Sequence, residues 1–170
     1  MIKNNNNFPY DLVLAQKLVY EPCRLICENI HQESESHDYG AYEFTVNNLR
    51  VKFRVARTTP KKSGQFVTLW KRINDVSPII PYDMQDSIDL FVVSVRDSGT
   101  FGQFVFPKQI LYEKGFISKQ GRGGKRAMRV YPPWVMPHSL VAIKTQQWQL
   151  LYYLEIQPYF DSKKANKLYL

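Results

Sequence analysis

The chain has 170 residues and a mass of 20.0 kDa, which is enough for one domain with a hydrophobic core and too short for two. Hydrophobic residues make up 44% of the sequence and aromatic residues 14%, which excludes a largely disordered chain because so much apolar surface can offset the entropy cost of folding. The net charge of +8 at pH 7 is distributed unevenly, since residues 1–43 carry a net −4 and the remainder therefore carries +12.

Two tracts without acidic residues carry most of the positive charge. Residues 50–72 contain eight Lys and Arg, and residues 114–154 contain no Asp or Glu. A field of one sign attracts phosphates, so these tracts favour a polyanionic partner. A solvated positive face without a partner is the alternative.

The domain organisation follows from composition. We expect a loose tail at residues 1–8, a single domain at 9–160 and a short C-terminal tail at 161–170. The sequence has no cleavable signal with an apolar centre and no run of eighteen apolar residues. These observations predict a cytoplasmic protein that does not interact with a membrane.

The N-terminal part of the domain has helical spacing. Apolar residues predict an amphipathic helix over residues 10–20, which Pro22 ends or kinks. A second helix is predicted over residues 23–30. Cys23 and Cys27 would share one face of it, and we interpret them as buried free thiols.

The middle of the chain changes to the period of β-strands. Residues 31–40 are polar and end in a glycine, which is typical of a loop. Short segments rich in Val, Phe and Thr then predict a sheet with hairpins. The predicted strands are residues 41–46, 49–57, 64–72, 87–97 and 102–107. The fourth segment is almost wholly apolar in its middle, as a central strand covered on both faces would be.

The C-terminal part returns to helices. A short helix is predicted over residues 107–115, a mobile basic loop over 120–126 and a closing helix over 139–156, with Ser139 as a possible N-cap. The order of elements predicts a mixed α/β or α+β domain.

Several long tracts, in this order and at these spacings, resemble the MepB family. They are ESHDYGAYEF, VKFRVARTTPKKSGQFVTLWKR, DLFVV, GQFVFPKQIL, GKRAMRVYPPW and QQWQLLYYL. The resemblance covers about residues 9–155. It implies a restriction-endonuclease-like fold, which is an α/β (α+β) domain with a mixed sheet of four to six strands flanked by helices. It implies very little about activity.

Nucleases of the PD-(D/E)XK type provide a test of activity. They need an acid on one strand and an acid-X-Lys on its neighbour, because carboxylates hold Mg²⁺ while the lysine helps to position or activate the attacking water. Here Leu69 stands two residues before Lys71, and Phe106 stands two residues before Lys108. The standard constellation is not found on either strand, so the sequence leaves enzymatic activity open.

A divergent nuclease or phosphodiesterase that uses Mg²⁺ or Mn²⁺ is one alternative hypothesis. Its weak catalytic candidates are Glu43, Asp86 and Asp89 with Lys71. Asp83 lies one helical turn before Asp86, but helix capping or pairing with Lys and Arg is the favoured explanation of these acids. The three histidines share no spacing, and no zinc site or other metal site is predicted.

The leading hypothesis is a basic groove that binds DNA, RNA or another phosphorylated ligand. Cations would contact phosphates and aromatic rings would stack on bases. The candidate binding residues are Arg54, Lys61, Lys62, Lys71, Arg72, Arg122, Lys125, Arg126, Arg129, Tyr131 and Trp134. Tyr131 and Trp134 could equally pack in the core. A third hypothesis is a protein-interaction module, which predicts an exposed apolar patch away from the basic tracts.

Overall fold

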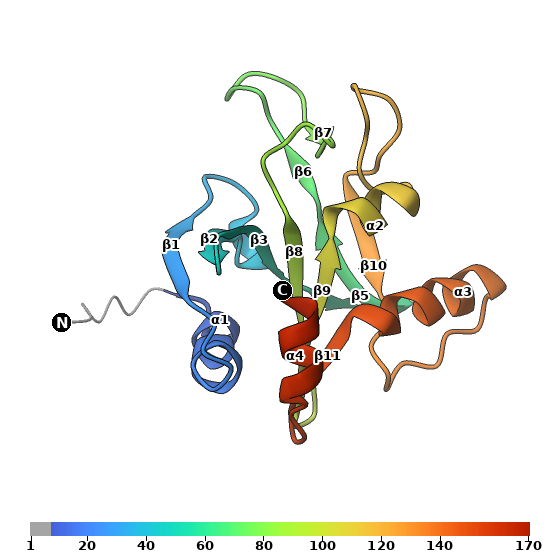
Figure 1. The fold of residues 1–170 in the computed structure, drawn as a ribbon. Helices are drawn as coiled ribbons and strands as arrows, with labels where there is room; N and C mark the ends of the chain where they lie inside the picture. Colours follow the sequence, from blue (N-terminus) through green and yellow to red (C-terminus); the bar gives the residue numbers. More distant parts are fainter. Residues whose placement is uncertain (1–7) are drawn as a thin grey trace.

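The structure is a computed structural model of the chain, and it describes residues 8–170 (Figure 1). The predicted N-terminal tail therefore lies almost wholly outside the described residues. The helical elements are α1 (Tyr10–Ala15), the π-helix η1 (Gln16–Tyr20), the 3₁₀-helix η2 (His37–Tyr39), α2 (Lys108–Glu113), α3 (Leu140–Gln149), the 3₁₀-helix η3 (Leu150–Tyr152) and α4 (Ser162–Leu168). The strands are β1 (Cys27–Gln32), β2 (Tyr42–Val46), β3 (Leu49–Val55), β4 (Arg57–Thr59), β5 (Lys62–Thr68), β6 (Trp70–Lys71), β7 (Ile80–Pro81), β8 (Leu90–Asp97), β9 (Thr100–Pro107), β10 (Ala127–Val130) and β11 (Tyr153–Gln157).

The central sheet has six strands in the order β1-β2-β3-β8-β9-β11. Strands β3 and β8 are parallel, and every other neighbouring pair is antiparallel. The chain is thus a mixed sheet flanked by helices, which confirms the predicted fold class and is compatible with a restriction-endonuclease-like fold. No helix in the described part of the chain is long and apolar enough to cross a membrane.

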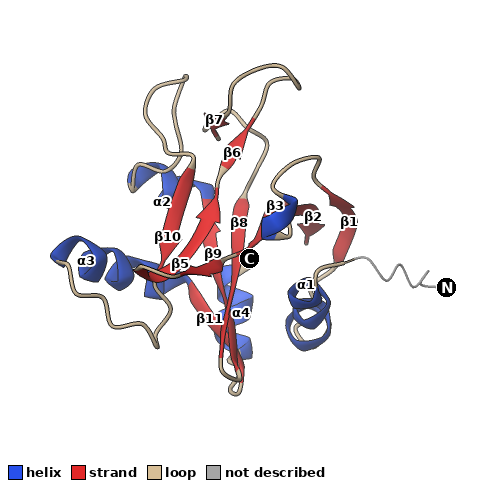
Figure 2. Cartoon of the chain, turned by 180° about the vertical axis from the view of Figure 1, so that it is seen from behind, coloured by secondary structure: helices blue, strands red, loops and turns tan. Residues whose placement is uncertain are grey.

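Two hydrophobic clusters cover the two faces of this sheet. On one face, Leu12, Val19 and Ala165 from α1, η1 and α4 pack against the sheet. On the other face, Val67 and Met128 belong to a smaller sheet, ordered β10-β5-β4, that packs with α2 and α3 (Figures 1 and 2). Strand β8 is buried from its first residue through six positions, as predicted for a central strand.

The predicted helix at residues 23–30 is wrong. Strand β1 occupies Cys27–Gln32 and pairs with β2 across an irregular register. Arg24 and Asn29 have positive φ angles, which a right-handed helix does not allow. Pairing along the exposed edge of β2 therefore overrides the local helical pattern. Cys23 and Cys27 are half-buried free thiols; Cys23 lies in the turn after η1 and Cys27 begins β1.

The predicted closing helix at 139–156 is too long. Helix α3 begins after Ser139, whose side chain accepts a hydrogen bond from the Ala142 N–H (3.1 Å) as expected of an N-cap. The chain then forms β11 at the edge of the central sheet, where the Tyr153 ring occupies the space above Gly102 that a Cβ atom would fill. Pairing with β9 thus decides the conformation of the last residues of the predicted helix.

Helix α4 (Ser162–Leu168) occupies most of the segment predicted as a C-terminal tail. Asp161 caps the helix by accepting a hydrogen bond from the Lys164 N–H (3.0 Å), and Ala165 and Tyr169 are fully buried. The Tyr169 hydroxyl lies 3.1 Å from that of Tyr20, so the C-terminal segment is part of the core.

Candidate functional site

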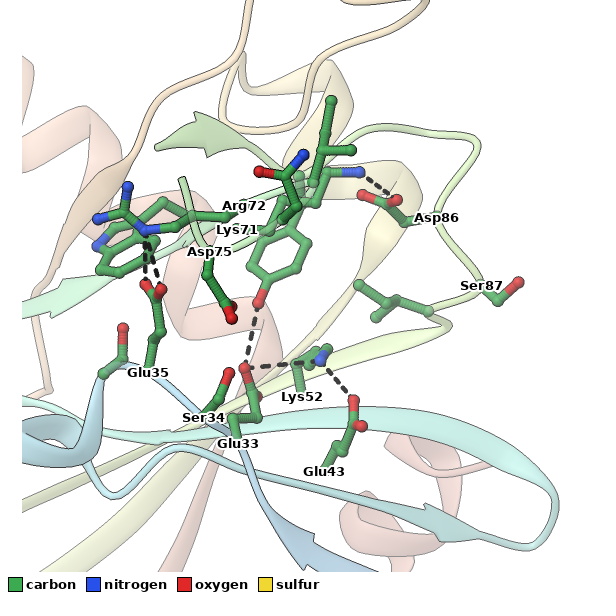
Figure 3. A pocket seen from close by; sticks show the side chains of 16 residues that line it. Glu33, Ser34, Glu35, Glu43, Lys52, Lys71, Arg72, Asp75, Asp86 and Ser87 are labelled. Atoms are coloured by element: carbon green, nitrogen blue, oxygen red, sulfur yellow. Dashed lines mark hydrogen bonds and ion pairs between the residues drawn. The ribbon is translucent and has the colours of Figure 1, made fainter. Parts of the chain in front are cut away.

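An ionic cavity of about 390 Å³ lies between the segment after β1, the β6–β7 hairpin and residues 86–88 (Figure 3). Acidic and basic side chains from segments far apart in the sequence line it together. They are Glu33, Glu35, Glu43, Asp75 and Asp86 with Lys52, Lys71 and Arg72. The cavity is therefore mixed in charge, not purely cationic.

Glu33 organises the deepest part of this cavity. Its carboxylate accepts two hydrogen bonds from the Arg54 guanidinium (2.6 and 3.0 Å), and Lys52 Nζ lies 3.6 Å away. The Tyr82 hydroxyl donates to it at 3.4 Å. Burial would lower the pKa of Arg54, but the hydrogen bonds and charge of Glu33 raise it above its usual value. Arg54 is thus a buried structural cation, paired with an acid and absent from the surface.

Glu43 and Lys52 face each other across the antiparallel strands β2 and β3 and form an ion pair. Burial acts to raise the pKa of Glu43, but Lys52 and His31 outweigh it and the pKa is lowered. His31 bonds to the Asn29 carbonyl (3.0 Å) and to Glu43, and these contacts raise its pKa. Lys52 was not among the candidate residues. The sequence could have indicated Lys52, because it stands between two buried residues of a strand and lies opposite an acid, Glu43, on the neighbouring strand.

The position two residues before Lys52 is Arg50, so the acid-X-Lys pattern is lacking on β3 as well. Asp86 pairs with Lys71 in the cavity, whereas Asp89 accepts a hydrogen bond from the Arg50 N–H (2.8 Å) and does not line it. Within residues 8–170, no three His, Cys, Asp or Glu side chains are grouped so that they could hold a metal ion. The structure thus brings together only part of the nuclease candidate set.

Asp83 fixes the basic loop to the body of the protein. Its carboxylate accepts hydrogen bonds from the Ser118 hydroxyl (2.7 Å), the Gly121 N–H (3.0 Å) and the Gln85 N–H (3.0 Å), and these lower its pKa well below the usual range. Asp83 therefore serves as a cap for a turn and a loop.

A second candidate region is the outward face of the small sheet. Arg57 of β4 and Arg129 of β10 each lie directly opposite Phe66 of β5. Residues opposite one another point to the same face of a sheet, so Arg57 and Arg129 share the face of Phe66, and the Arg129 guanidinium lies 5.8 Å from that ring. Lys61 and Lys62 are exposed at the turn between β4 and β5. We call Arg57, Lys61, Lys62, Phe66 and Arg129 the cationic face.

The cations predicted for binding divide into two groups. Arg54, Lys71 and Arg72 form ion pairs with acids in or beside the ionic cavity. Within residues 8–170, the others have no acidic partner: Lys61, Lys62, Arg122, Lys125, Arg126 and Arg129. Arg129 instead donates to Thr59 Oγ1 (2.9 Å) and to backbone carbonyls of the β4–β5 turn, among them that of Ser63 (3.1 Å).

The unpaired cations do not all converge. Lys125 lies over the Phe116 ring (5.0 Å), beside α2, while Arg122 and Arg126 are exposed in the same glycine-rich loop. This loop and the β6–β7 hairpin project from the same end of the molecule in Figure 1. Gly124 of the glycine-rich loop packs closely against Pro81 of β7, so the loop and the β6–β7 hairpin are in contact.

The two predicted stacking residues are half-buried. Trp134 packs edge-on against Tyr153 in the core cluster (6.4 Å between ring centroids), and the Tyr131 ring lies against Gly64. The aromatic rings near the cationic face are instead Tyr39, Phe66 and Trp70. The alternation of β5 and β6 could have identified two of them, because Phe66 and Trp70 occupy every second position with Thr68 between them.

The structure thus combines a mixed six-stranded sheet, an ionic cavity and a cationic face on a smaller sheet. The MepB-like family matches residues 33–155, and the chain belongs to this family. A solved crystal structure of MepB is similar to the chain, with 30% sequence identity and a TM-score of 0.75. The similarity covers 89% of this chain and 100% of that one. No curated protein matches the chain.

Proposed function

We propose that the chain binds nucleic acid across the cationic face. The observation that carries this proposal is the row formed by Arg57, Phe66 and Arg129 on three adjacent strands. Guanidinium groups bind phosphates with two parallel hydrogen bonds, and an aromatic ring between them can stack on a base. Neither arginine has an acidic partner within residues 8–170, so their charges are not neutralised. Arg129 also holds the β4–β5 turn through both terminal nitrogens of its guanidinium, so the exposed Arg57 is the one suited to a bidentate contact with phosphate.

The length of the face supports a polymer rather than a single small phosphate. Lys62 begins β5, and Trp70 stands eight residues further along, which corresponds to about 27 Å of extended chain. Arg72 stacks on Trp70 (5.5 Å) at the far end. Unpaired cations are therefore available at one end and in the middle of this surface, and the far end offers the Trp70 ring beside an arginine that is paired with Glu35.

The test is the salt dependence of binding to a fluorescein-labelled 12-nucleotide single strand, measured by fluorescence anisotropy. A triple variant replaces Arg57, Lys61 and Lys62 by Gln. Since each neutralised phosphate contributes about 0.7 to the slope of log K against log salt for a single strand, the variant should reduce that slope by about 2.

A matched control carries the same change in charge on the opposite side of the central sheet. It replaces Lys17 of η1 and Lys163 and Lys167 of α4, all exposed, by Gln. We expect it to bind almost as tightly as the wild type. An equal loss in both triple variants would show that only net charge matters and would contradict a defined surface.

The ionic cavity supports a second candidate function. It is lined by three of the four residues of the metal-dependent phosphodiesterase hypothesis, Glu43, Asp86 and Lys71, but not by Asp89. Each of these carboxylates already pairs with a lysine, which lowers its availability to a cation. Calorimetric titration with Mn²⁺ in wild type and Asp86→Asn is the test, and only a heat of binding lost in the variant would support this function.

The protein-interaction hypothesis rests on exposed apolar side chains that lie within the acid-free tract 114–154 and not, as predicted, away from the basic tracts. Met136, Leu140 and Val141 are 78%, 75% and 76% exposed around the start of α3. Exposed apolar side chains that lie close together are common at protein-binding surfaces. Charge reversal on the cationic face would leave such binding unchanged, which separates it from nucleic-acid binding.

A further inference from the structure

A second cavity, of about 310 Å³, opens beside the cationic face. Residues 35–39 form one wall of it, and Thr68 and Trp70 form the other. The aromatic residues Tyr39 and Trp70 both line this space, and both are half-buried, so their positions are set by the fold. We call it the aromatic cavity. It shares Glu35, Ser36 and Trp70 with the ionic cavity, which makes the two neighbours.

The walls of the aromatic cavity are held in place by contacts on both sides. The Tyr39 ring packs edge-on against Phe66 (6.0 Å between centroids). The Thr68 hydroxyl donates to Ser36 Oγ (3.1 Å), which ties the 35–39 segment to β5. His37 Nε2 bonds to the Glu33 carbonyl at 2.8 Å. The wall that carries Tyr39 is therefore fixed to β5, and the cavity lined by Tyr39 and Trp70 is a feature of the fold.

The polar groups at the rim are suited to the edge of a nucleobase. Asp38 and the Ser36 hydroxyl line the cavity and offer oxygen acceptors, which can receive hydrogen bonds from exocyclic amino groups. The negative charge of Glu35 is largely compensated, because its carboxylate accepts from Arg72 Nε (2.8 and 3.2 Å). Flat aromatic walls with a polar rim are the usual means by which proteins bind unstacked bases.

A cation without an acidic partner lies on one side of the aromatic cavity, where a phosphate next to such a base would be, since Arg129 lies 5.8 Å from the Phe66 ring. On the other side Arg72 lies 5.5 Å from the Trp70 ring, but its charge is paired with Glu35. The aromatic cavity therefore adjoins the cationic face at Phe66, against which Tyr39 packs.

We infer that the aromatic cavity receives one unstacked nucleobase, and that the chain therefore prefers single-stranded to duplex nucleic acid. This inference rests on the proposed function and adds the class of substrate to it. A base inside a duplex is paired and stacked, and moving it out costs free energy that a single strand has already lost. The preference thus arises at Tyr39 and Trp70, while the cationic face contributes to binding of both forms.

The experiment compares a labelled 12-nucleotide single strand with the blunt duplex of the same sequence, by fluorescence anisotropy at one salt concentration. The proteins are wild type, Trp70→Ala, Trp70→Phe and the control Tyr159→Ala, whose ring is 78% exposed after β11. We expect the wild type to bind the single strand at least about tenfold more tightly than the duplex. Trp70→Ala should weaken single-strand binding about tenfold, and Trp70→Phe should retain most of it because a ring remains.

A second readout follows tryptophan emission. Stacking of a base on Trp70 should quench part of the wild-type fluorescence on addition of the single strand, and Trp70→Phe should lose this quenching while it still binds. Circular dichroism establishes that each variant is folded. If Trp70→Ala folds and binds the single strand as tightly as wild type, the inference is overturned and the proposed function stands. If neither nucleic acid binds to wild type, the proposed function itself is overturned.

Discussion

Replacing Glu33 by Gln should destabilise the protein strongly, because it leaves the Arg54 guanidinium buried without its charge partner. Arg54 is only 1% exposed, and both of its contacts with Glu33 are close (2.6 and 3.0 Å). Removing one member of a buried ion pair costs about 3–5 kcal/mol. Since Glu33 borders a cavity, the lower end of about 3 kcal/mol is expected. With a urea dependence of about 2 kcal/mol per molar, the midpoint should fall by about 1.5 M.

Urea unfolding followed by circular dichroism measures this effect, with Glu35→Gln as the matched control. The Glu35–Arg72 pair is one-third exposed on both sides, so its loss should cost at most about 1 kcal/mol. The double variant Glu33→Leu with Arg54→Met should recover much of the stability, because it removes both buried charges. Equal midpoints for the Glu33 and Glu35 variants would refute the assignment of Arg54 as a structural cation.

Three further outcomes follow from the geometry. Gly64→Ala should lower the free energy of unfolding, measured by urea titration, by more than about 1 kcal/mol. The reason is that Gly64 has φ +77° and a Cβ atom there would lie 2.8 Å from the Tyr131 ring. An unchanged urea midpoint would contradict that packing. Asp83→Asn should cost about 1–3 kcal/mol at pH 7. Because folding lowers the pKa of Asp83, its contribution is complete above the usual value near 4 and is lost as the pH falls toward the lowered pKa, so a wild-type advantage that grew on acidification would contradict it. Burial raises the pKa of the Cys27 thiol to about 12, so little reactive thiolate is present at pH 8. Iodoacetamide at pH 8 should therefore alkylate Cys27 at least about tenfold more slowly in the folded protein than in urea, as followed by mass spectrometry. Equal alkylation rates would contradict the burial of Cys27.

The sequence predicted the elements whose local pattern agrees with their tertiary environment. Strand β8 is almost wholly apolar over its first six residues, which are buried, and the family resemblance indicated the mixed sheet around it. The errors fall where pairing with a distant strand decides the conformation. Strands β1 and β11 form the two edges of the central sheet, and both segments have helical spacing that pairing overrides.

The candidate site could be predicted only in part for a similar reason. The distribution of charge along the sequence identified the basic tracts, but it does not show which Lys and Arg side chains form ion pairs with acids in the folded protein. Lys71 and Arg72 pair with Asp86 and Glu35, fifteen and thirty-seven residues away. The row of Arg57, Phe66 and Arg129 depends on the register of β4, β5 and β10, and β10 follows a long connection. Such convergence arises from topology and not from local spacing.

The most direct test of the central claim is an amide chemical-shift titration of the ¹⁵N-labelled chain with the unlabelled 12-nucleotide single strand. Binding across the cationic face predicts shift changes confined to residues 35–39, 57–70 and 127–131, with α4 and η1 unaffected. Changes centred on α4, or spread evenly over the lysines of both sides, would contradict a nucleic-acid surface on the small sheet.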